Sequence, residues 1–268
     1  MTSSSGKSGP RLSASRAAAD WLAPALTAVV VLAAWEALGR SGLYSPHLLP
    51  PPSAVARALN DMAVSGLLWT DFAATGHRWL LGLLIGNVLG IALGVLTGSW
   101  RFARGSVGTL MHALRTIPFL ILIPVAMLWL GLGEAEKVGI AAWGAAFPVW
   151  LNAQTSLLNV EREYVWAARS LGARNLRLVW EVHLPRSLPF LVAGLRVSIA
   201  TTTFALAAAE MSGAFEGLGF RVFYTYQMFQ TDKMMAGIVV ISLAGLLLDR
   251  LFVLTVERLV PWKAEASD

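Results

Sequence analysis

The chain has no cysteine and few charged residues. The absence of cysteine from its 268 residues excludes disulfides, thiolate catalysis and cysteine metal ligands. Charged residues make up only 14% of the chain, against about a quarter in ordinary globular proteins, whereas 56% of its residues are hydrophobic. This balance excludes a soluble enzyme, a disordered chain and a nucleic-acid-binding module. The composition is typical of a membrane protein.

Motifs for metal or nucleotide binding are also absent. The four histidines are scattered and show no H-E-x-x-H or other ligand spacing, so we expect no metal site. Gly6-Lys7-Ser8 resembles the end of a phosphate-binding loop, but Met1 occupies the position of the first glycine and no strand precedes it. We expect no catalytic residue and no cofactor in this chain, so that any ATP is hydrolysed by another subunit.

Six apolar stretches are long enough to cross a membrane, which takes about 20 residues of helix. They are residues 21–39, 71–98, 107–131, 137–157, 188–211 and 234–257. The first stretch follows Lys7, Arg11 and Arg16, as a signal peptide would, but it is long for one and lacks a small-residue cleavage site. We therefore predict an all-α, polytopic membrane protein with six transmembrane helices.

Basic residues predict the orientation of these spans. With a cytoplasmic N-terminus, 12 of the 21 Lys and Arg residues fall in inside segments and 5 in outside segments. Positive charge favours the cytoplasmic side, so both termini are expected there. Residues 1–18 form a Ser- and Gly-rich, disordered terminus in this interpretation, 19–262 the membrane domain and 263–268 a cytoplasmic tail.

A proline run precedes a short helix on the predicted outer side. Leu49 to Ser53 contains three prolines, and Ala54–Met62 carries apolar residues at helical spacing. We expect Ser53 to act as the N-cap of this surface helix.

Glycine recurs every fourth residue along the second apolar stretch, at Gly82, Gly86, Gly90, Gly94 and Gly98. On a helix these residues form one stripe, against which another backbone packs closely. The stripe serves either static packing or a sliding interface between helices. Prolines interrupt two other stretches, at Pro118, Pro124 and Pro148, which indicates a bundle or a solute pathway.

The predicted cytoplasmic loop of residues 161–185 has helical character. An acidic first turn and Gly172 at its stop predict a helix over Glu161–Leu171. Asn175 is placed to cap a second short helix, which includes Leu176, Val179, Trp180 and His183 and ends at Pro185. Such a loop favours docking to a partner protein, the alternative being an amphipathic element on the bilayer surface.

The same loop resembles the EAA loop of ABC importer permeases, written E-A-A-x3-G-x9-I-x-L-P. The matching residues are Trp166, Ala167, Ala168, Gly172, Val182, Leu184 and Pro185, with Trp166 in place of the acidic residue and Val182 in place of isoleucine. Further matches are similar to the nitrate, sulfonate and taurine permeases. They are Leu48–Ser53, Leu114–Pro118, Leu128–Glu134, Gly194–Arg196, Ala209–Glu210, Gly217–Phe220 and Thr231–Asp232.

The resemblance implies a type I ABC importer fold in the cytoplasmic (inner) membrane. Two copies of the permease would pair with two cytoplasmic ATPase subunits that bind ATP and Mg, while an extracytoplasmic solute-binding protein delivers the solute. The loop at 161–185 would then dock on the ATPase, and residues 19–262 would form the permease domain. The solute is expected to be an anion such as a sulfonate, taurine or nitrate, although permeases of this kind also carry bicarbonate and uncharged or cationic molecules.

Polar residues inside the predicted spans are candidates for the translocation path. They are Arg115, Arg196, Thr201, Thr202, Thr203 and Glu210. An arginine in a membrane needs water, a partner or a route to the interface, so structural ion pairing is the alternative. An ion-coupled secondary transporter would predict inverted repeats, which the sequence lacks. A membrane enzyme would use Glu36, Glu210 or Asp249, which show no nucleophile or metal spacing.

Overall fold

The computed structural model describes residues 11–45, 47–160, 162–174, 176–178 and 184–259, and every regular element in these ranges is helical. The all-α prediction is therefore confirmed for the described chain. The elements are α1 (Arg11–Arg40), α2 (Pro52–Val64), α3 (Leu67–Ser99), α4 (Arg101–Ala103), the π-helical turn η1 (Arg104–Gly108), α5 (Thr109–Leu114), α6 (Phe119–Leu130), α7 (Glu134–Leu158), α8 (Arg162–Ser170), α9 (Leu176–Leu178), α10 (Leu184–Gly213), α11 (Leu218–Gln227) and α12 (Thr231–Leu259).

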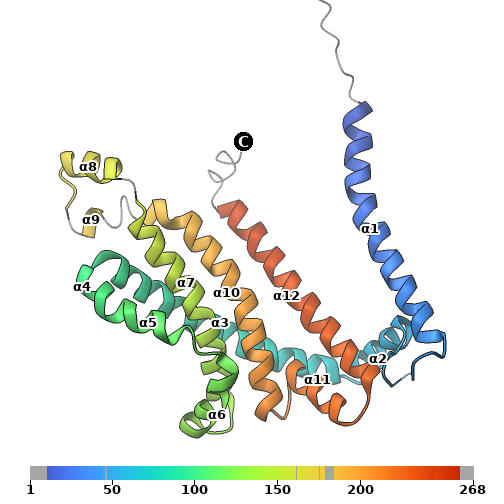
Figure 1. Ribbon diagram of the computed structural model, residues 1–268. Coiled ribbons are helices and arrows are strands. Elements are labelled where there is room, and N and C mark those ends of the chain that lie inside the picture. The colour runs from blue at the N-terminus through green and yellow to red at the C-terminus, as the bar shows by residue number, and fades with distance from the viewer. Residues whose placement is uncertain (1–10, 46, 161, 175, 179–183, 260–268) are drawn as a thin grey trace, which may run out of the picture.

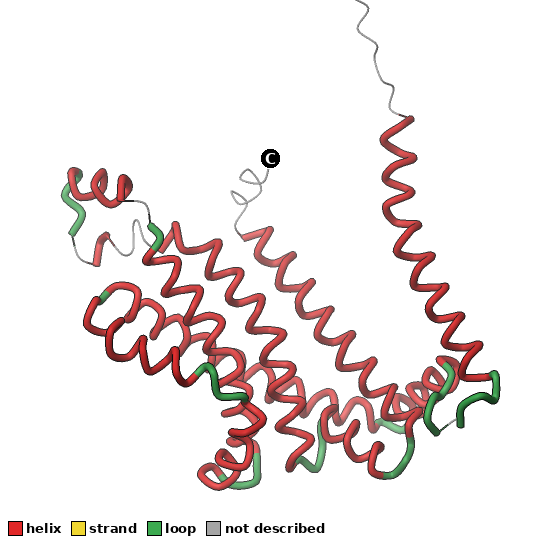
Figure 2. Tube along the Cα trace, in the orientation of Figure 1, coloured by secondary structure: helices red, strands yellow, loops and turns green. Residues whose placement is uncertain are grey.

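Helix α7 lies at the centre of the bundle. It packs against α3 and α10, and α10 in turn packs against α12 (Figure 1). Its buried face carries Ala141, Ala145, Val149, Trp150 and Ala153, each at most 1% exposed. Helix α1 contacts α2 and otherwise stands apart from the bundle, while α8 and α9 lie at the end opposite α6 and α11 (Figure 2). The end of the bundle that carries α8 and α9 therefore differs in structure from the end that carries α6 and α11.

In the part of the chain that the structure describes, three helices are long and apolar enough to cross a membrane, namely α3, α10 and α12. They correspond to the predicted spans 71–98, 188–211 and 234–257. The predicted span 107–131 corresponds to a pair of helical segments bent by 100°, which makes up to four spans if that pair counts as one. The spans predicted at 21–39 and 137–157 fall on α1 and α7, which do not meet the same criteria in the described chain, so the count of six stays a prediction.

The bend at Pro118 divides the third predicted span. Thr116 and Ile117 donate backbone hydrogen bonds to Ala113 and Leu114, which ends α5 in a tight turn. Pro118 has no amide hydrogen and adopts an extended conformation before α6. The prediction that Pro118 interrupts this span is thus confirmed, whereas Pro124 and Pro148 lie inside α6 and α7 without ending them.

The prediction that Ser53 caps the outer helix is wrong. Helix α2 begins at Pro52, two residues before the predicted start at Ala54, with Pro51 as its N-cap. Ser53 instead donates from its hydroxyl to Glu36 Oε1 at 2.8 Å and from its backbone N–H to Glu36 Oε2 at 3.0 Å. The Glu36 carboxylate, supplied by α1, thus satisfies the positive end of α2. Proline fits the first helical position because its missing N–H would have no partner there.

The glycine stripe of α3 is the face that packs against α7. A methyl group at Gly82, Gly86, Gly90, Gly94 or Gly98 would overlap α7 atoms, and at Gly90 it would lie 2.5 Å from the Ala146 carbonyl oxygen. The two backbones therefore meet at a distance that only glycine allows on α3. Lipid tails are as apolar as side chains, so this close van der Waals contact, and not hydrophobicity, holds the pair together.

Substitution of Gly90 by alanine tests this packing. We expect Gly90→Ala to destabilise the purified permease by about 1–3 kcal/mol, because the added methyl group forces α3 and α7 apart. The measurement is the thermal unfolding midpoint in detergent. Gly76→Ala is the matched control, since a methyl group at Gly76 of the same helix meets nothing within 4 Å.

The same pair of variants separates the two roles of the stripe. Static packing predicts that Gly90→Ala lowers both the midpoint and transport. A sliding interface predicts lost transport at an unchanged midpoint, and an unchanged midpoint together with normal transport would contradict both.

Candidate functional site

Helix α8 ends in a Schellman motif at the predicted glycine. The N–H of Ala173 donates to the Ala168 carbonyl at 3.0 Å, and the N–H of Gly172 donates to the Arg169 carbonyl at 3.0 Å. Gly172 has φ of +87°, a conformation that a side chain disfavours. The expected chain reversal after this helix is therefore present at Gly172.

Large apolar side chains of this loop face outward. Trp166 is 61% exposed and Leu171 is 87% exposed. The Arg186 guanidinium lies 3.1 Å from the centre of the Tyr164 ring, which joins α8 to the first turns of α10. The loop thus offers an apolar contact surface that is linked to a long helix of the bundle.

The remaining EAA-like residues are described only in part. Val182 lies outside the described residues, as do Asn175, Val179, Trp180 and His183 of the predicted second helix. The described part of that helix is α9, and the backbones of Leu184 and Pro185 begin α10.

The two arginines proposed for the translocation path lie in different settings. Arg196 donates from Nε and Nη2 to the two oxygens of Asp249, at 2.7 and 2.8 Å, and so ties α10 to α12. Arg115 is the C-cap of α5, immediately before the 100° bend, and its side chain is exposed. No hydrogen bond or ion pair joins the Arg115 side chain to another described residue. Arg196 matches the structural alternative, whereas Arg115 is exposed.

The three threonines of α10 do not line one route. Thr201 donates to the Gly144 carbonyl of α7 at 2.8 Å, whereas Thr203 accepts a hydrogen bond from Trp79 Nε1 of α3 at 3.1 Å. Thr202 is fully buried. Glu210 lies 14 residues beyond Arg196 on α10, or about 21 Å away at 1.5 Å per residue. The structure therefore separates these path candidates.

Glu210 belongs instead to a buried charge cluster centred on Arg78. Arg78 Nη1 donates to Glu210 Oε1 at 3.0 Å and to the Glu216 backbone carbonyl at 2.8 Å. Its Nε donates to Glu134 Oε2 at 2.8 Å. The side chains of Arg78 and Glu210 are 3% and 0% exposed. The cluster joins α3, the start of α7 and the end of α10.

The first turn of α11 is capped by the same cluster. Three consecutive backbone N–H groups donate to side chains of other helices: Gly217 to Asp71, Leu218 to Thr75 and Gly219 to Glu210, at 2.8–2.9 Å. Gly217 adopts φ of +124°, and a methyl group there would collide with the Glu210 carboxylate. Side chains of α3 and α10 thus satisfy the helix end that would otherwise be unpaired in the membrane.

Glu134 is the exposed member of the cluster, at the first residue of α7. The hydrogen bonds from Arg78 hold the pKa of the Glu134 carboxyl below its ordinary value. The pair therefore stabilises the fold above the ordinary carboxyl pKa, and this contribution is lost as the pH falls through the lowered value.

The cluster around Arg78 is not among the sites predicted from the sequence, in which Glu210 is a path residue. The available signal was the spacing of Asp71, Thr75 and Arg78, which are i, i+4 and i+7 on one face of an otherwise apolar helix. Ionisable residues within a membrane helix face partners in the bundle, which is where these side chains lie. Among the described residues, no group of three or more His, Asp and Glu side chains is placed to hold a metal ion.

Residues 86–261 match the family described as binding-protein-dependent transport system inner membrane component. The chain is 30% identical over 243 residues to a protein provisionally assigned as the aliphatic sulfonates transport permease SsuC of Bacillus subtilis (strain 168), covering 91% of this chain and 88% of that protein. It is 32% identical over 246 residues to the taurine transport system permease protein TauC of Escherichia coli (strain K12), covering 90% of each.

A solved structure has a similar fold. This is the MetNI methionine ABC transporter in an inward-facing conformation, with a TM-score of 0.51 and 25% sequence identity. The match covers 70% of this chain and 95% of that one. The expected type I ABC importer permease fold is therefore confirmed.

Removal of the Arg78 charge tests the cluster. We expect Arg78→Gln to destabilise the permease by about 3–5 kcal/mol, because it leaves the Glu210 carboxylate buried without its cation. The measurement is again the unfolding midpoint. Arg40→Gln is the control, since Arg40 pairs with Glu36 at the end of α1 and its side chain is 66% exposed. Equal effects of the two variants would contradict a structural role for the cluster.

Proposed function

Because the chain belongs to the family of binding-protein-dependent transport inner membrane components, and is thus an ABC importer permease, we propose that two copies of it form the translocation path for a small anion. The observation that carries the choice of an anionic group is the similarity to an aliphatic sulfonates permease and to the taurine permease over about 90% of this chain, because both kinds of cargo carry a sulfonate. The cargo class we infer is a sulfonate such as taurine, or an inorganic anion such as nitrate. We assign ATP hydrolysis to other subunits, because this chain is a permease and its relatives are permease subunits, not the ATPases, of their transporters.

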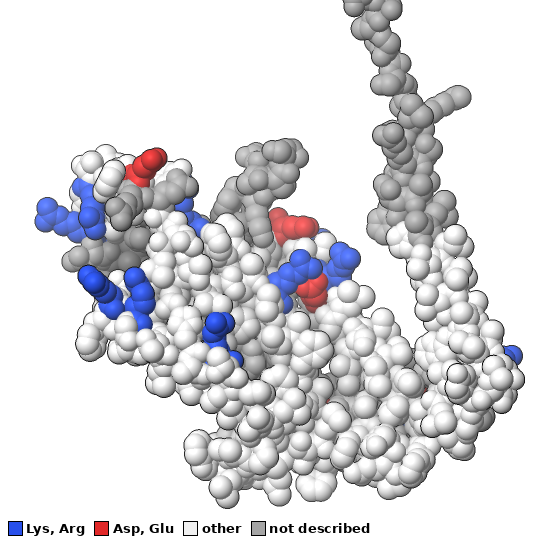
Figure 3. All heavy atoms as spheres, viewed as in Figure 1, with Lys and Arg blue, Asp and Glu red and all other residues white. Residues whose placement is uncertain are grey.

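The partners follow from the family. We propose that two separate ATPase subunits bind ATP and Mg on the cytoplasmic side, and that a solute-binding protein delivers the anion from outside. The clustering of Lys and Arg around the α8–α9 end supports a cytoplasmic location for that end and for both termini (Figure 3). The largely uncharged region beyond it supports burial of the remaining surface in the inner membrane.

The α8–α9 loop is proposed as the coupling element. Trp166 and Leu171 present exposed apolar surface for a partner groove, and Gly172 fixes the turn that follows α8. The contact of Tyr164 with Arg186 connects this surface to α10. Movement of the ATPase would therefore be passed to a helix that carries both Arg196 and Glu210.

Arg115 is proposed as the residue of the path that meets the anion. Its guanidinium is exposed at the break between α5 and α6, where the chain turns by 100°. An exposed cation there attracts an anionic solute and discriminates against a cationic one. We assign Arg196 a structural role, because its charge is already neutralised by the ion pair with Asp249.

Two substitutions in the loop test the coupling role. We expect Gly172→Val and Ala168→Asp to abolish ATP-dependent uptake in reconstituted vesicles and to reduce retention of the ATPase, because the first strains the turn and the second alters α8. Gly66→Val is the matched control: Gly66 also has a positive φ, of +83°, but lies at the opposite end of the fold, between α2 and α3.

Normal uptake in both loop variants would contradict coupling through α8 and α9. The same vesicles test the alternative of an ion-coupled secondary transporter. An ABC permease shows no uptake without its ATPase and ATP, whereas uptake driven by an ion gradient alone would favour the alternative.

The proposed anion site is tested by Arg115→Gln. We expect uptake of taurine or nitrate to fall about tenfold, with intact assembly and ATPase stimulation, which corresponds to about 1.4 kcal/mol. Arg101→Gln is the control, because Arg101 is an exposed arginine of the neighbouring helix α4. Arg196→Gln is expected to lower the unfolding midpoint instead. Normal uptake in Arg115→Gln would exclude the role.

A further inference from the structure

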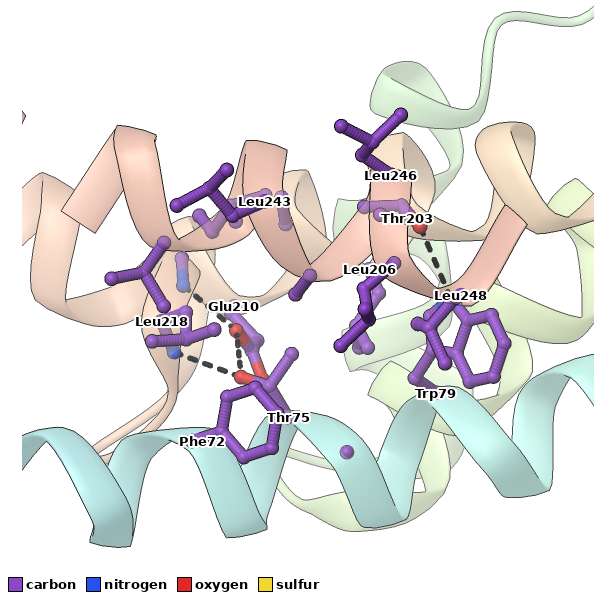
Figure 4. A pocket seen from close by; sticks show the side chains of 18 of the residues that line it. Phe72, Thr75, Trp79, Thr203, Leu206, Glu210, Leu218, Leu243, Leu246 and Leu248 are labelled. Atoms are coloured by element: carbon purple, nitrogen blue, oxygen red, sulfur yellow. Dashed lines mark hydrogen bonds between the residues drawn. The ribbon is translucent and has the colours of Figure 1, made fainter. Parts of the chain in front are cut away.

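A crevice of about 710 Å³ lies between α3 and α12. Its floor is α10, which contributes Thr203, Leu206, Ala207 and Glu210 (Figure 4). Phe72 and Trp79 of α3 line one wall, and leucines of α12 line the other. The volume is in the range of sites that hold a small ligand.

The walls of the crevice are apolar and open to the surroundings of the bundle. Leu80 of α3 is 61% exposed, and Leu243 and Leu247 of α12 are 57% and 61% exposed. Leu218 and Gly219 line it at the α11 end. In a bilayer such a crevice faces the hydrocarbon between the two helices.

The polar groups of the floor already have partners. Thr203 accepts from Trp79 and donates to the Ile199 carbonyl. Thr75 donates to Glu210 and accepts from the Leu218 N–H, and Glu210 is further bonded to Arg78. A polar solute would find no free hydrogen-bonding group on this floor, whereas a hydrocarbon chain requires none.

One end of the crevice carries a cation, Arg250 of α12. No hydrogen bond or ion pair joins Arg250 to another described residue, because the neighbouring Asp249 is engaged by Arg196. Arg250 lies seven residues before the predicted cytoplasmic end of this span at residue 257, or about 10 Å along the helix. The long arginine side chain reaches from this depth toward the headgroups of the cytoplasmic leaflet.

We propose that this crevice binds an anionic phospholipid of the cytoplasmic leaflet, with one acyl chain between α3 and α12 and its phosphate at Arg250. Basic residues at the cytoplasmic ends of membrane helices attract anionic headgroups, and the apolar walls bury the chain. The site is independent of the transported solute. Only the choice of the cytoplasmic leaflet depends on the proposed function, through the orientation that places the α8–α9 end in the cytoplasm.

The test is native mass spectrometry of the delipidated full-length permease titrated with phosphatidylglycerol and phosphatidylcholine. We expect Arg250→Gln to weaken phosphatidylglycerol binding at least fivefold and to leave phosphatidylcholine binding unchanged. Arg258→Gln is the matched control: it is an exposed arginine of the same helix, two turns further on and outside the crevice. Equal affinities in the two variants would overturn the headgroup assignment.

A second variant tests the acyl chain. Gly245 lines the crevice and a methyl group there meets nothing within 4 Å, so the larger side chain of Gly245→Trp is directed into the open space of the crevice. We expect it to abolish retention of both lipids, whereas Leu254→Trp, on the exposed surface of α12 away from the crevice, retains them. Equal retention would overturn the proposal.

Occupation by a second copy of the chain is the competing outcome. The natural chain has no cysteine, so single cysteines at Gly245 and at Val30 of the exposed helix α1 report on contact between copies. Disulfide formation between two copies in the bilayer would place α1 in the crevice and exclude the lipid. All of these readouts are independent of transport, so failure of the lipid site leaves the permease function untouched.

Discussion

The buried Arg78 guanidinium constrains the end of the bundle at which α11 lies. A charge removed from water is tolerated only where opposite charges and hydrogen-bond acceptors surround it, and the carboxylates of Glu134 and Glu210 and the Glu216 carbonyl fill these positions. The acceptors come from the start of α7, the end of α10 and the loop before α11. These elements cannot separate without exposing an unpaired charge, so their relative placement follows from one side chain of α3.

Packing along the rest of α3 follows a different rule. Between Gly82 and Gly98 the glycine stripe lets the two backbones meet directly, and Trp150 of α7 donates to the Thr97 hydroxyl at 3.1 Å. Dispersion contacts of this kind are individually weak and collectively large, and they require complementary surfaces over several turns. Helix α3 is thus held by the charged hydrogen bonds of Arg78 at one end and by close van der Waals contact with α7 along its remainder.

Local features of the fold were predictable from the sequence. The hydrophobic lengths of α3, α10 and α12, the stop of α8 at Gly172 and the break at Pro118 each follow from residues adjacent in the chain. These are properties of a single helix or turn, so propensity and hydropathy determine them.

Features that join distant segments were not predictable in this way. The cap of α2 is supplied by Glu36, 17 residues away, and the caps of α11 come from α3 and α10. A serine before a helix normally caps it, but a carboxylate delivered by another helix competes successfully at Ser53. The cluster around Arg78 likewise depends on which helix faces meet, and spacing within α3 indicates only that Asp71, Thr75 and Arg78 share a face.

The break between α5 and α6 has an electrostatic consequence. The aligned peptide dipoles of a helix leave a partial negative charge at its C-terminus. Arg115 lies at that terminus, and its positive charge is stabilised there by the dipole of α5 even when no solute is bound. The fold thus stabilises an exposed cation at the end of α5 before any solute arrives, so an anion at this proposed path residue would replace water around a charge that is already in place.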